Sequence, residues 1–137
     1  MKRMDKLFNW ISVVGGVLGG FLAYWLGGWD VLLKTIVFMS ILDYVTGWIK
    51  AIYNKRMSSE IGFRGILKKI VMFIVIAVAY AIQLLVNDTV PLREVVITFY
   101  IANEALSILE NAAEFIKIPD KLKSVLLQLR DKNSEGE

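Results

Sequence analysis

The stretch IVMFIVIAVAYAIQLLV (residues 70–86) determines how the rest of the chain is interpreted. Gln83 is its only strongly polar residue. A hydrocarbon core about 30 Å thick requires roughly 20 helical residues to cross it. A helix over residues 65–86 meets that length, so the sequence predicts a membrane-spanning helix here. In lipid, every backbone polar group must be satisfied within the protein, which favours helices throughout the chain.

The composition agrees with a membrane protein and excludes several classes of function. The chain has 137 residues, of which 56% are hydrophobic, and a soluble domain of this size could not bury so much apolar surface. It contains neither Cys nor His, which excludes disulfides, histidine catalysis and typical zinc sites. Because nucleophile motifs, phosphate-binding loops and metal-ligand clusters are also absent from the sequence, we expect no enzymatic activity and no cofactor. The small net charge of +3 gives no basic patch typical of nucleic-acid binding.

Four segments are expected to form transmembrane helices, over residues of about 7–29, 31–53, 65–86 and 91–116. Gly27, Gly28 and Asp30 predict a tight turn between the first two segments, and Pro91 suits the first turn of the fourth. Residues 54–64 are expected to form a polar loop. The predicted fold is therefore all-α, an integral membrane helical bundle. Since the fourth segment carries several charges, three crossings plus an amphipathic helix is the alternative.

The C-terminal region differs from the transmembrane domain, which we assign to residues 1–117. After Pro119, apolar residues recur at helical spacing and predict a short amphipathic helix: they are Leu122, Val125, Leu126 and Leu129. Residues 131–137 are expected to form a disordered polar tail. Residues 118–137 are thus predicted to be a cytoplasmic helix and tail.

The distribution of basic residues predicts the topology. Of the 16 Lys and Arg residues, all but Lys34 and Arg93 fall in three clusters, at the N-terminus, around residues 50–69 and in the C-terminal region. Cytoplasmic loops of membrane proteins carry an excess of Lys and Arg. Four crossings with both termini in the cytoplasm place all three clusters inside, whereas three crossings would leave one outside.

Two sets of residues could mediate helix packing or assembly. Gly15 and Gly19, and Gly16 and Gly20, form small-xxx-small pairs that permit close approach of helices in lipid. This pattern leaves open packing within one chain or self-association. On the second segment, Asp43, Thr46, Gly47 and Lys50 share one helix face. Since a charged carboxylate near the bilayer centre is costly, Asp43 is protonated, paired to a Lys or Thr, or faces a pore or subunit interface.

The fourth segment has a polar stripe, which either lines an aqueous path or forms a polar seam between helices. Its members are Tyr100, Asn103, Glu104, Ser107, Glu110, Asn111 and Glu114. We expect the polar faces of the second and fourth segments to be poorly satisfied in a single chain, which would favour assembly. The residues predicted to form a pore or oligomer face are Asp43, Thr46, Lys50, Asn103, Glu104, Ser107, Glu110 and Asn111. The glycines predicted to mediate helix packing are Gly15, Gly16, Gly19, Gly20 and Gly47.

Two blocks of sequence resemble the phage-lysis and toxin-secretion holins of Gram-positive bacteria, including the holin-like protein of clostridial toxin loci. The first runs LDYVTG (residues 42–47) through Ala51 to SSEIGFRGILKK (residues 58–69), and the second is NEALSILEN (residues 103–111) followed by Ile118-Pro119. The resemblance covers the chain from the first segment to about Leu129.

The resemblance implies a membrane protein that accumulates harmlessly and then homo-oligomerises into lesions at a threshold. Such lesions release an endolysin or help to export a toxin. The start Met1-Lys2-Arg3-Met4 also resembles the dual start of several holins. Two alternatives stay open: a small four-helix proton-coupled exporter, and a non-conducting anti-holin or scaffold.

Overall fold

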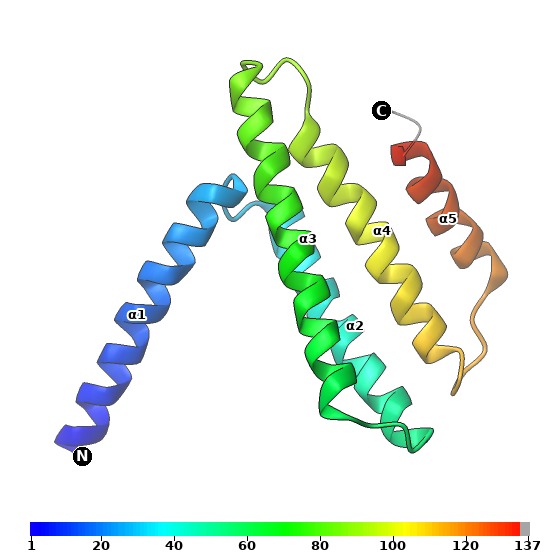
Figure 1. The fold of residues 1–137 in the computed structure, drawn as a ribbon, viewed down its shortest axis with the longest axis horizontal. Coiled ribbons are helices and arrows are strands. Elements are labelled where there is room, and N and C mark those ends of the chain that lie inside the picture. The colour runs from blue at the N-terminus through cyan, green and yellow to red at the C-terminus, as the bar shows by residue number, and fades with distance from the viewer. Residues whose placement is uncertain (135–137) are drawn as a thin grey trace.

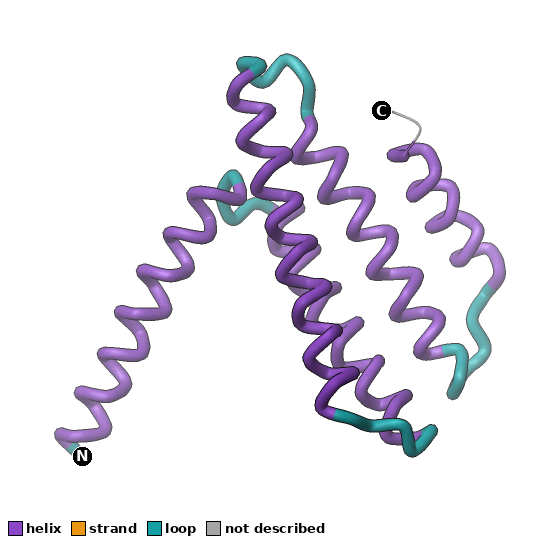
Figure 2. The backbone as a smooth tube through the Cα atoms, in the orientation of Figure 1, coloured by secondary structure: helices purple, strands orange, loops and turns teal. Residues whose placement is uncertain are grey.

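A computed structural model describes residues 1–134, within which every regular element is an α-helix and no strand occurs (Figures 1 and 2). The five helices are α1 (Lys2–Leu26), α2 (Val31–Tyr53), α3 (Ser59–Leu85), α4 (Leu92–Ala112) and α5 (Asp120–Ser134). Helices α1, α2 and α3 are long and apolar enough to cross a membrane. The all-helical membrane fold is thus confirmed, and the crossing by α4 stays a prediction.

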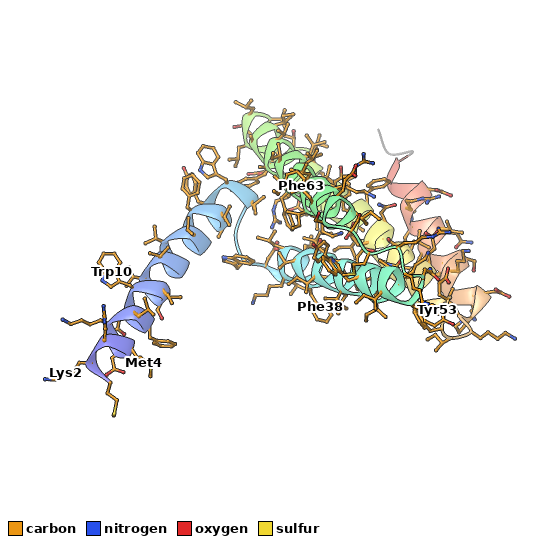
Figure 3. The ribbon with its side chains drawn as sticks, turned by 60° about the horizontal axis from the view of Figure 1, so that its bottom comes forward. Lys2, Met4, Trp10, Phe38, Tyr53 and Phe63 are labelled. Carbon is orange, nitrogen blue, oxygen red and sulfur yellow. The ribbon has the colours of Figure 1, made fainter. Side chains whose placement is uncertain are left out.

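Helices α2, α3 and α4 form the bundle, whereas α1 diverges from it. Helix α4 contacts α2, α3 and α5, and α5 runs back beside α4 (Figure 1). Helix α1 contacts α3, and its only buried residue is Leu26, at its last position. Figure 3 shows Lys2, Met4 and Trp10 projecting from the far end of α1, well away from the bundle. Most of α1 therefore has no partner within the chain.

The apolar core lies in the half of the bundle nearer the α1–α2 turn. Its most buried members include Leu33 and Ile36 from α2, Ile76 from α3 and Ile97 from α4, each with 0% of its surface exposed. Met72 of α3 belongs to the same buried cluster. Since lipid is itself apolar, close packing rather than exclusion of water stabilises such a core in a membrane.

Several helix boundaries differ from the sequence-based expectation, including the end of α1, which lies at Leu26 rather than near residue 29 because Gly27 and Gly28 turn the chain. Helix α1 begins at Lys2, because its basic and apolar residues are good helix formers and hydropathy alone marks only the apolar part. Helix α3 begins at Ser59 rather than near residue 65, since the Ser58 hydroxyl accepts a hydrogen bond from the Ile61 N–H at 3.2 Å and caps the helix. The polar loop is thus shorter than predicted.

At the other end of the bundle, α4 ends at Ala112 instead of near residue 116. The chain then turns, and the Phe115 ring packs edge-on against Tyr53 of α2 with ring centroids 5.0 Å apart. The expected disordered tail is wrong for residues 131–134, which continue α5 to Ser134. Residues 135–137, the rest of that tail, lie outside the described residues.

The predicted turn between α1 and α2 is present and depends on two glycines. Gly27 and Gly28 adopt φ angles of 87° and 96°, a region that other residues enter only at a cost. Asp30 then caps α2 by accepting a hydrogen bond from the Leu33 N–H at 2.9 Å.

Substituting Gly27 with alanine is expected to lower the thermal unfolding midpoint in detergent, measured by circular dichroism. The strained φ costs about 1–2 kcal/mol, and the new Cβ would clash with the Arg93 guanidinium. Gly15→Ala is the matched control, because a Cβ there meets nothing within 4 Å and alanine favours the helix. Equal midpoints for Gly27→Ala and the wild type would refute this account of the turn.

Candidate functional site

A buried ion cluster joins the three bundle helices at mid-length. Lys69 Nζ of α3 donates hydrogen bonds to Asp43 Oδ2 of α2, at 2.7 Å, and to Glu104 Oε2 of α4. Only 15%, 17% and 5% of these side chains is exposed, in the order Lys69, Asp43 and Glu104. Because an unpaired charge in lipid is costly, this pairing holds α2, α3 and α4 together. Asp43 was expected to be protonated, paired to a Lys or Thr, or turned to a pore or subunit interface, and the structure shows it paired to a lysine.

The polar contacts continue from this ion cluster toward the α2–α3 loop. Asn111 Nδ2 donates to Thr46 Oγ1 at 3.1 Å and lies 3.4 Å from Asp43 Oδ1. The last of these polar contacts is the ion pair of Lys50 Nζ with Glu114 Oε1, which are 3.6 Å apart. Gly47 lies beside this amide, and a Cβ there would be in ordinary van der Waals contact with Asn111 Nδ2, at 3.8 Å. The predicted polar face of α2 therefore meets the polar stripe of α4.

The structure gathers most of the predicted polar residues but separates others. Ser107 borders the same cavity as Asp43 and Asn111. Glu110 is exposed and borders α5 instead, and Asn103 is half-buried. The expectation that the polar faces lack partners in a single chain is wrong for Asp43, Glu104 and Asn111, because their complements lie on neighbouring helices of the same chain. Their role in a pore or oligomer stays a prediction.

The predicted packing glycines of α1 do not contact the rest of the chain through their small faces. A Cβ built at any of the four would find no atom within 4 Å: they are Gly15, Gly16, Gly19 and Gly20. The backbone carbonyl of Gly19 does accept a hydrogen bond from Trp29 Nε1 at 3.2 Å. These glycines therefore do not mediate close helix packing within the single chain, and their role in self-association stays a prediction.

A second polar network closes the end of the bundle near the α1–α2 turn. The Arg93 guanidinium of α4 pairs with both carboxylate oxygens of Asp30, with Nη1–Oδ2 at 2.7 Å and Nη2–Oδ1 at 2.9 Å. It also donates to the Leu26 carbonyl, which is left without a helical partner where α1 ends, and to the Gly28 carbonyl in the turn. The Arg93 N–H donates to Gln83 Oε1 at 2.8 Å. One arginine thereby ties α4 to the turn that carries α1.

Comparisons with known proteins bear on the identity of this bundle. Residues 20–131 match the family model described as the bacteriophage holin family. The chain belongs to the bacteriophage holin family. It is 35% identical over 104 residues to a probable holin of Bacillus phage phi105, covering 75% of this chain and 77% of that protein. No solved structure matches.

Two bacterial proteins are more similar still to this member of the holin family. An uncharacterized 14.9 kDa protein in the nagH 3′ region of Clostridium perfringens is 41% identical over 131 residues, which cover 94% of this chain and 99% of that protein. Protein Lmo0128 of Listeria monocytogenes, also uncharacterized, is 38% identical over 125 residues, covering 89% of each. The similarity therefore extends over nearly the whole length of these relatives.

The holin match includes both polar networks. It spans α2, α3 and α4 completely, but begins at Gly20 and so leaves out Gly15, Gly16 and Gly19. Holins permeabilise membranes, are not enzymes and in general oligomerise in the membrane. The chain is accordingly a non-enzymatic membrane protein.

Sequence reasoning missed the two cations that organise this holin's networks. Lys69 was assigned to a basic cluster at the membrane surface, and Arg93 was noted only as an exception to the charge pattern. One signal was available for Lys69, because it shares a helical stripe with Met72, Ile76 and Gln83, all of which are buried. A lysine and a glutamine on one buried stripe both require polar partners. Arg93 gave no comparable signal, since its partners come from a turn distant in sequence.

Stability is expected to depend on pH through Asp30. The hydrogen bond from Arg93 lowers the pKa of the Asp30 carboxyl from its usual value of 3.8. A lowered folded-state pKa adds stability above the unfolded value, which is lost as pH falls through the folded value. The Asp30→Asn variant keeps a capping residue but loses the ion pair.

Unfolding midpoints of the two proteins in detergent should therefore differ at pH 5–7, begin to converge below about pH 4, where the unfolded-state carboxyl is protonated, and meet only as pH falls through the lower folded-state pKa. A gap that stays constant down to the lowest pH at which both proteins fold would contradict this role for Asp30.

Proposed function

We propose that the chain acts as a holin that homo-oligomerises in the bacterial cytoplasmic membrane and forms lesions. The observation that carries this proposal is α1, an apolar helix with almost no partner in its own chain. Its exposed side chains include Phe8, Ile11, Val14 and Leu18. In lipid, these surfaces and the open glycine face can pack against other copies. Family membership supports the same function.

The proposed topology has four crossings with both termini in the cytoplasm. Helix α4 is tied to α2 at both ends, by Arg93 to Asp30 and by Glu114 to Lys50. Its 21 residues reach about 31 Å at 1.5 Å per residue. A membrane that α2 spans is therefore spanned by α4 too.

This topology has a consequence for α5. The helix is too charged to lie in hydrocarbon, so in a membrane it would move from α4 to the cytoplasmic surface. The face that α4 would then turn to lipid contains Leu106 and Leu109, which border α5 in the structure.

The intrachain polar pairs suggest how the resting protein could stay harmless. Each bundle satisfies its own ion cluster, so accumulation through α1 alone would leave the membrane sealed. A lesion would form when the α2 and α4 faces exchange their intrachain partners for water, exposing Asp43, Glu104 and Asn111. The proposed downstream partner is an endolysin or a secreted toxin that crosses through the lesion.

The test is inducible expression in a bacterium with a potential-sensitive dye, with and without an endolysin. We expect normal growth, then abrupt depolarisation, with lysis only when the endolysin is present. Substrate efflux without depolarisation would instead indicate a proton-coupled exporter. Unchanged potential and growth at high expression would indicate an anti-holin or scaffold. Either result contradicts the proposal.

A matched pair of variants tests the role of α1. Gly15→Leu should delay depolarisation, because it blocks close helix approach without meeting any atom of its own chain. Val17→Leu, at an exposed position of the same helix, should keep wild-type timing at equal expression. Equal timing for both variants would argue against assembly through the glycine face.

A further inference from the structure

A cavity of about 250 Å³ lies between α2, α3 and α4, next to the Asp43–Lys69 pair. Asp43, Lys69, Ser107 and Asn111 form its polar inner end. The cavity extends past Ala51 to residues 57 and 58, at the α2–α3 loop. One end therefore lies at the ion cluster and the other at the end of the bundle where α2 and α3 are joined.

Two aromatic residues of α2 form the side wall of this cavity. The Tyr44 and Trp48 rings pack edge-to-face with centroids 5.8 Å apart, and the Tyr44 hydroxyl donates to the Gly62 carbonyl of α3 at 3.3 Å. A Cβ at Gly62 would lie 2.9 Å from the Trp48 ring, and one at Gly65 would lie 3.2 Å from the Tyr44 ring. The rings thus occupy a notch on α3 that only glycine leaves free.

Between the ion cluster and the Arg93 network at the α1–α2 turn, apolar side chains from α2, α3 and α4 fill the centre of the bundle. The fully buried side chains among them are those of Leu33, Ile36, Ile76 and Ile97. We call these four residues the apolar plug. A path that starts at the α2–α3 loop therefore ends at the ion cluster.

Charge balance explains why the cavity should hold water. When ionised, Asp43, Glu104 and Lys69 leave one uncompensated negative charge, which is costly in a membrane unless water or another cation is near. A lysine ammonium has three donors, and two of those of Lys69 are used by the carboxylates. At about 30 Å³ per molecule, the cavity has room for roughly eight waters.

We infer that this cavity is a water-filled vestibule in each single chain, open on the α2–α3 loop side and closed by the apolar plug. It hydrates the ion cluster before any lesion forms. The inference requires only that the bundle lies in a membrane, and it does not depend on lesion formation.

Because the chain has no cysteine, single-cysteine variants test this vestibule directly. Membrane vesicles of both orientations, prepared at low expression with the potential intact, are treated with a membrane-impermeant thiol reagent. The variants are Ser107→Cys in the vestibule, Lys55→Cys in the exposed loop and Ser40→Cys as the matched buried serine. Ser40 is 5% exposed and borders an apolar groove facing α1.

The expected result is modification of Ser107→Cys in the same vesicle orientation as Lys55→Cys, with no modification of Ser40→Cys. Adding Gly47→Leu, which places side-chain atoms in the cavity, should abolish modification at residue 107 and leave residue 55 reactive. The inference is overturned if Ser107→Cys is as unreactive as Ser40→Cys, or reacts only from the opposite side. Modification at residue 107 that is insensitive to Gly47→Leu would also overturn it.

Discussion

Replacing Lys69 with methionine is expected to destabilise the folded chain by about 3–5 kcal/mol, the range found when one partner of a buried ion pair is removed. The variant leaves the carboxylates of Asp43 and Glu104 facing each other without their shared cation. The midpoint of thermal unfolding in detergent, followed by circular dichroism, measures the effect.

Two controls separate this effect from a general loss of charge. Lys68→Met removes an exposed neighbour and should leave the midpoint close to that of the wild type. Neutralising the whole ion cluster, with Asp43→Asn and Glu104→Gln added to Lys69→Met, should recover much of the loss, because no unpaired charge then remains. If Lys69→Met and Lys68→Met unfold at the same temperature, the ion cluster does not hold the bundle together.

Replacing Arg93 with methionine is expected to produce the second large effect, at the end of the bundle near the α1–α2 turn. The buried Leu26 carbonyl loses its donor, and a buried unsatisfied group costs about 1–3 kcal/mol, whereas the Gly28 carbonyl keeps the Asp30 N–H at 3.0 Å. The half-exposed Asp30 is solvated in part and contributes less. Since α1 contacts little else, its angle to the bundle should also become more variable.

Spin labels on cysteines introduced at Val13 of α1 and Val78 of α3 measure this second consequence. Both positions are exposed, and the distance distribution between them should broaden in the Arg93→Met background. Arg93→Lys should not restore it, because an ammonium cannot replace the two-point contact of a guanidinium. Lys34→Met, at an exposed lysine near the same turn, should leave the distribution unchanged. An unbroadened distribution in Arg93→Met would show that Arg93 does not fix α1.

The helices could be predicted from sequence because hydropathy and turn residues are local signals. The apolar run over residues 70–86 and the Gly27-Gly28 turn each identify an element without reference to the rest of the chain. The start of α3 was missed because hydropathy does not register a cap, although Ser58 followed by Glu60 was visible in the sequence. Crossing by α4 stays a prediction that hydropathy alone does not give, since the polar residues of this helix find their partners on α2 and α3.

The site was only partly predictable for a related reason. Helical periodicity showed that Asp43, Thr46 and Lys50 share a face, and that Glu104 and Asn111 share another. It could not show that these faces meet each other, or that Lys69 of a third helix lies between them. Which helix faces pack together depends on the three-dimensional arrangement of the bundle. The unpartnered state of α1 likewise became visible only when the rest of the bundle was in place.

The most direct test of the central claim uses purified protein reconstituted into liposomes that contain a self-quenched dye. The protein-to-lipid ratio is varied while dye release is recorded. Because permeabilisation is proposed to require assembly, release should be negligible at low ratios and rise steeply above a threshold, with Gly15→Leu shifting that threshold upward. Release proportional to protein at all ratios, or none at the highest ratio, would contradict the claim that this chain opens membranes by assembling in them.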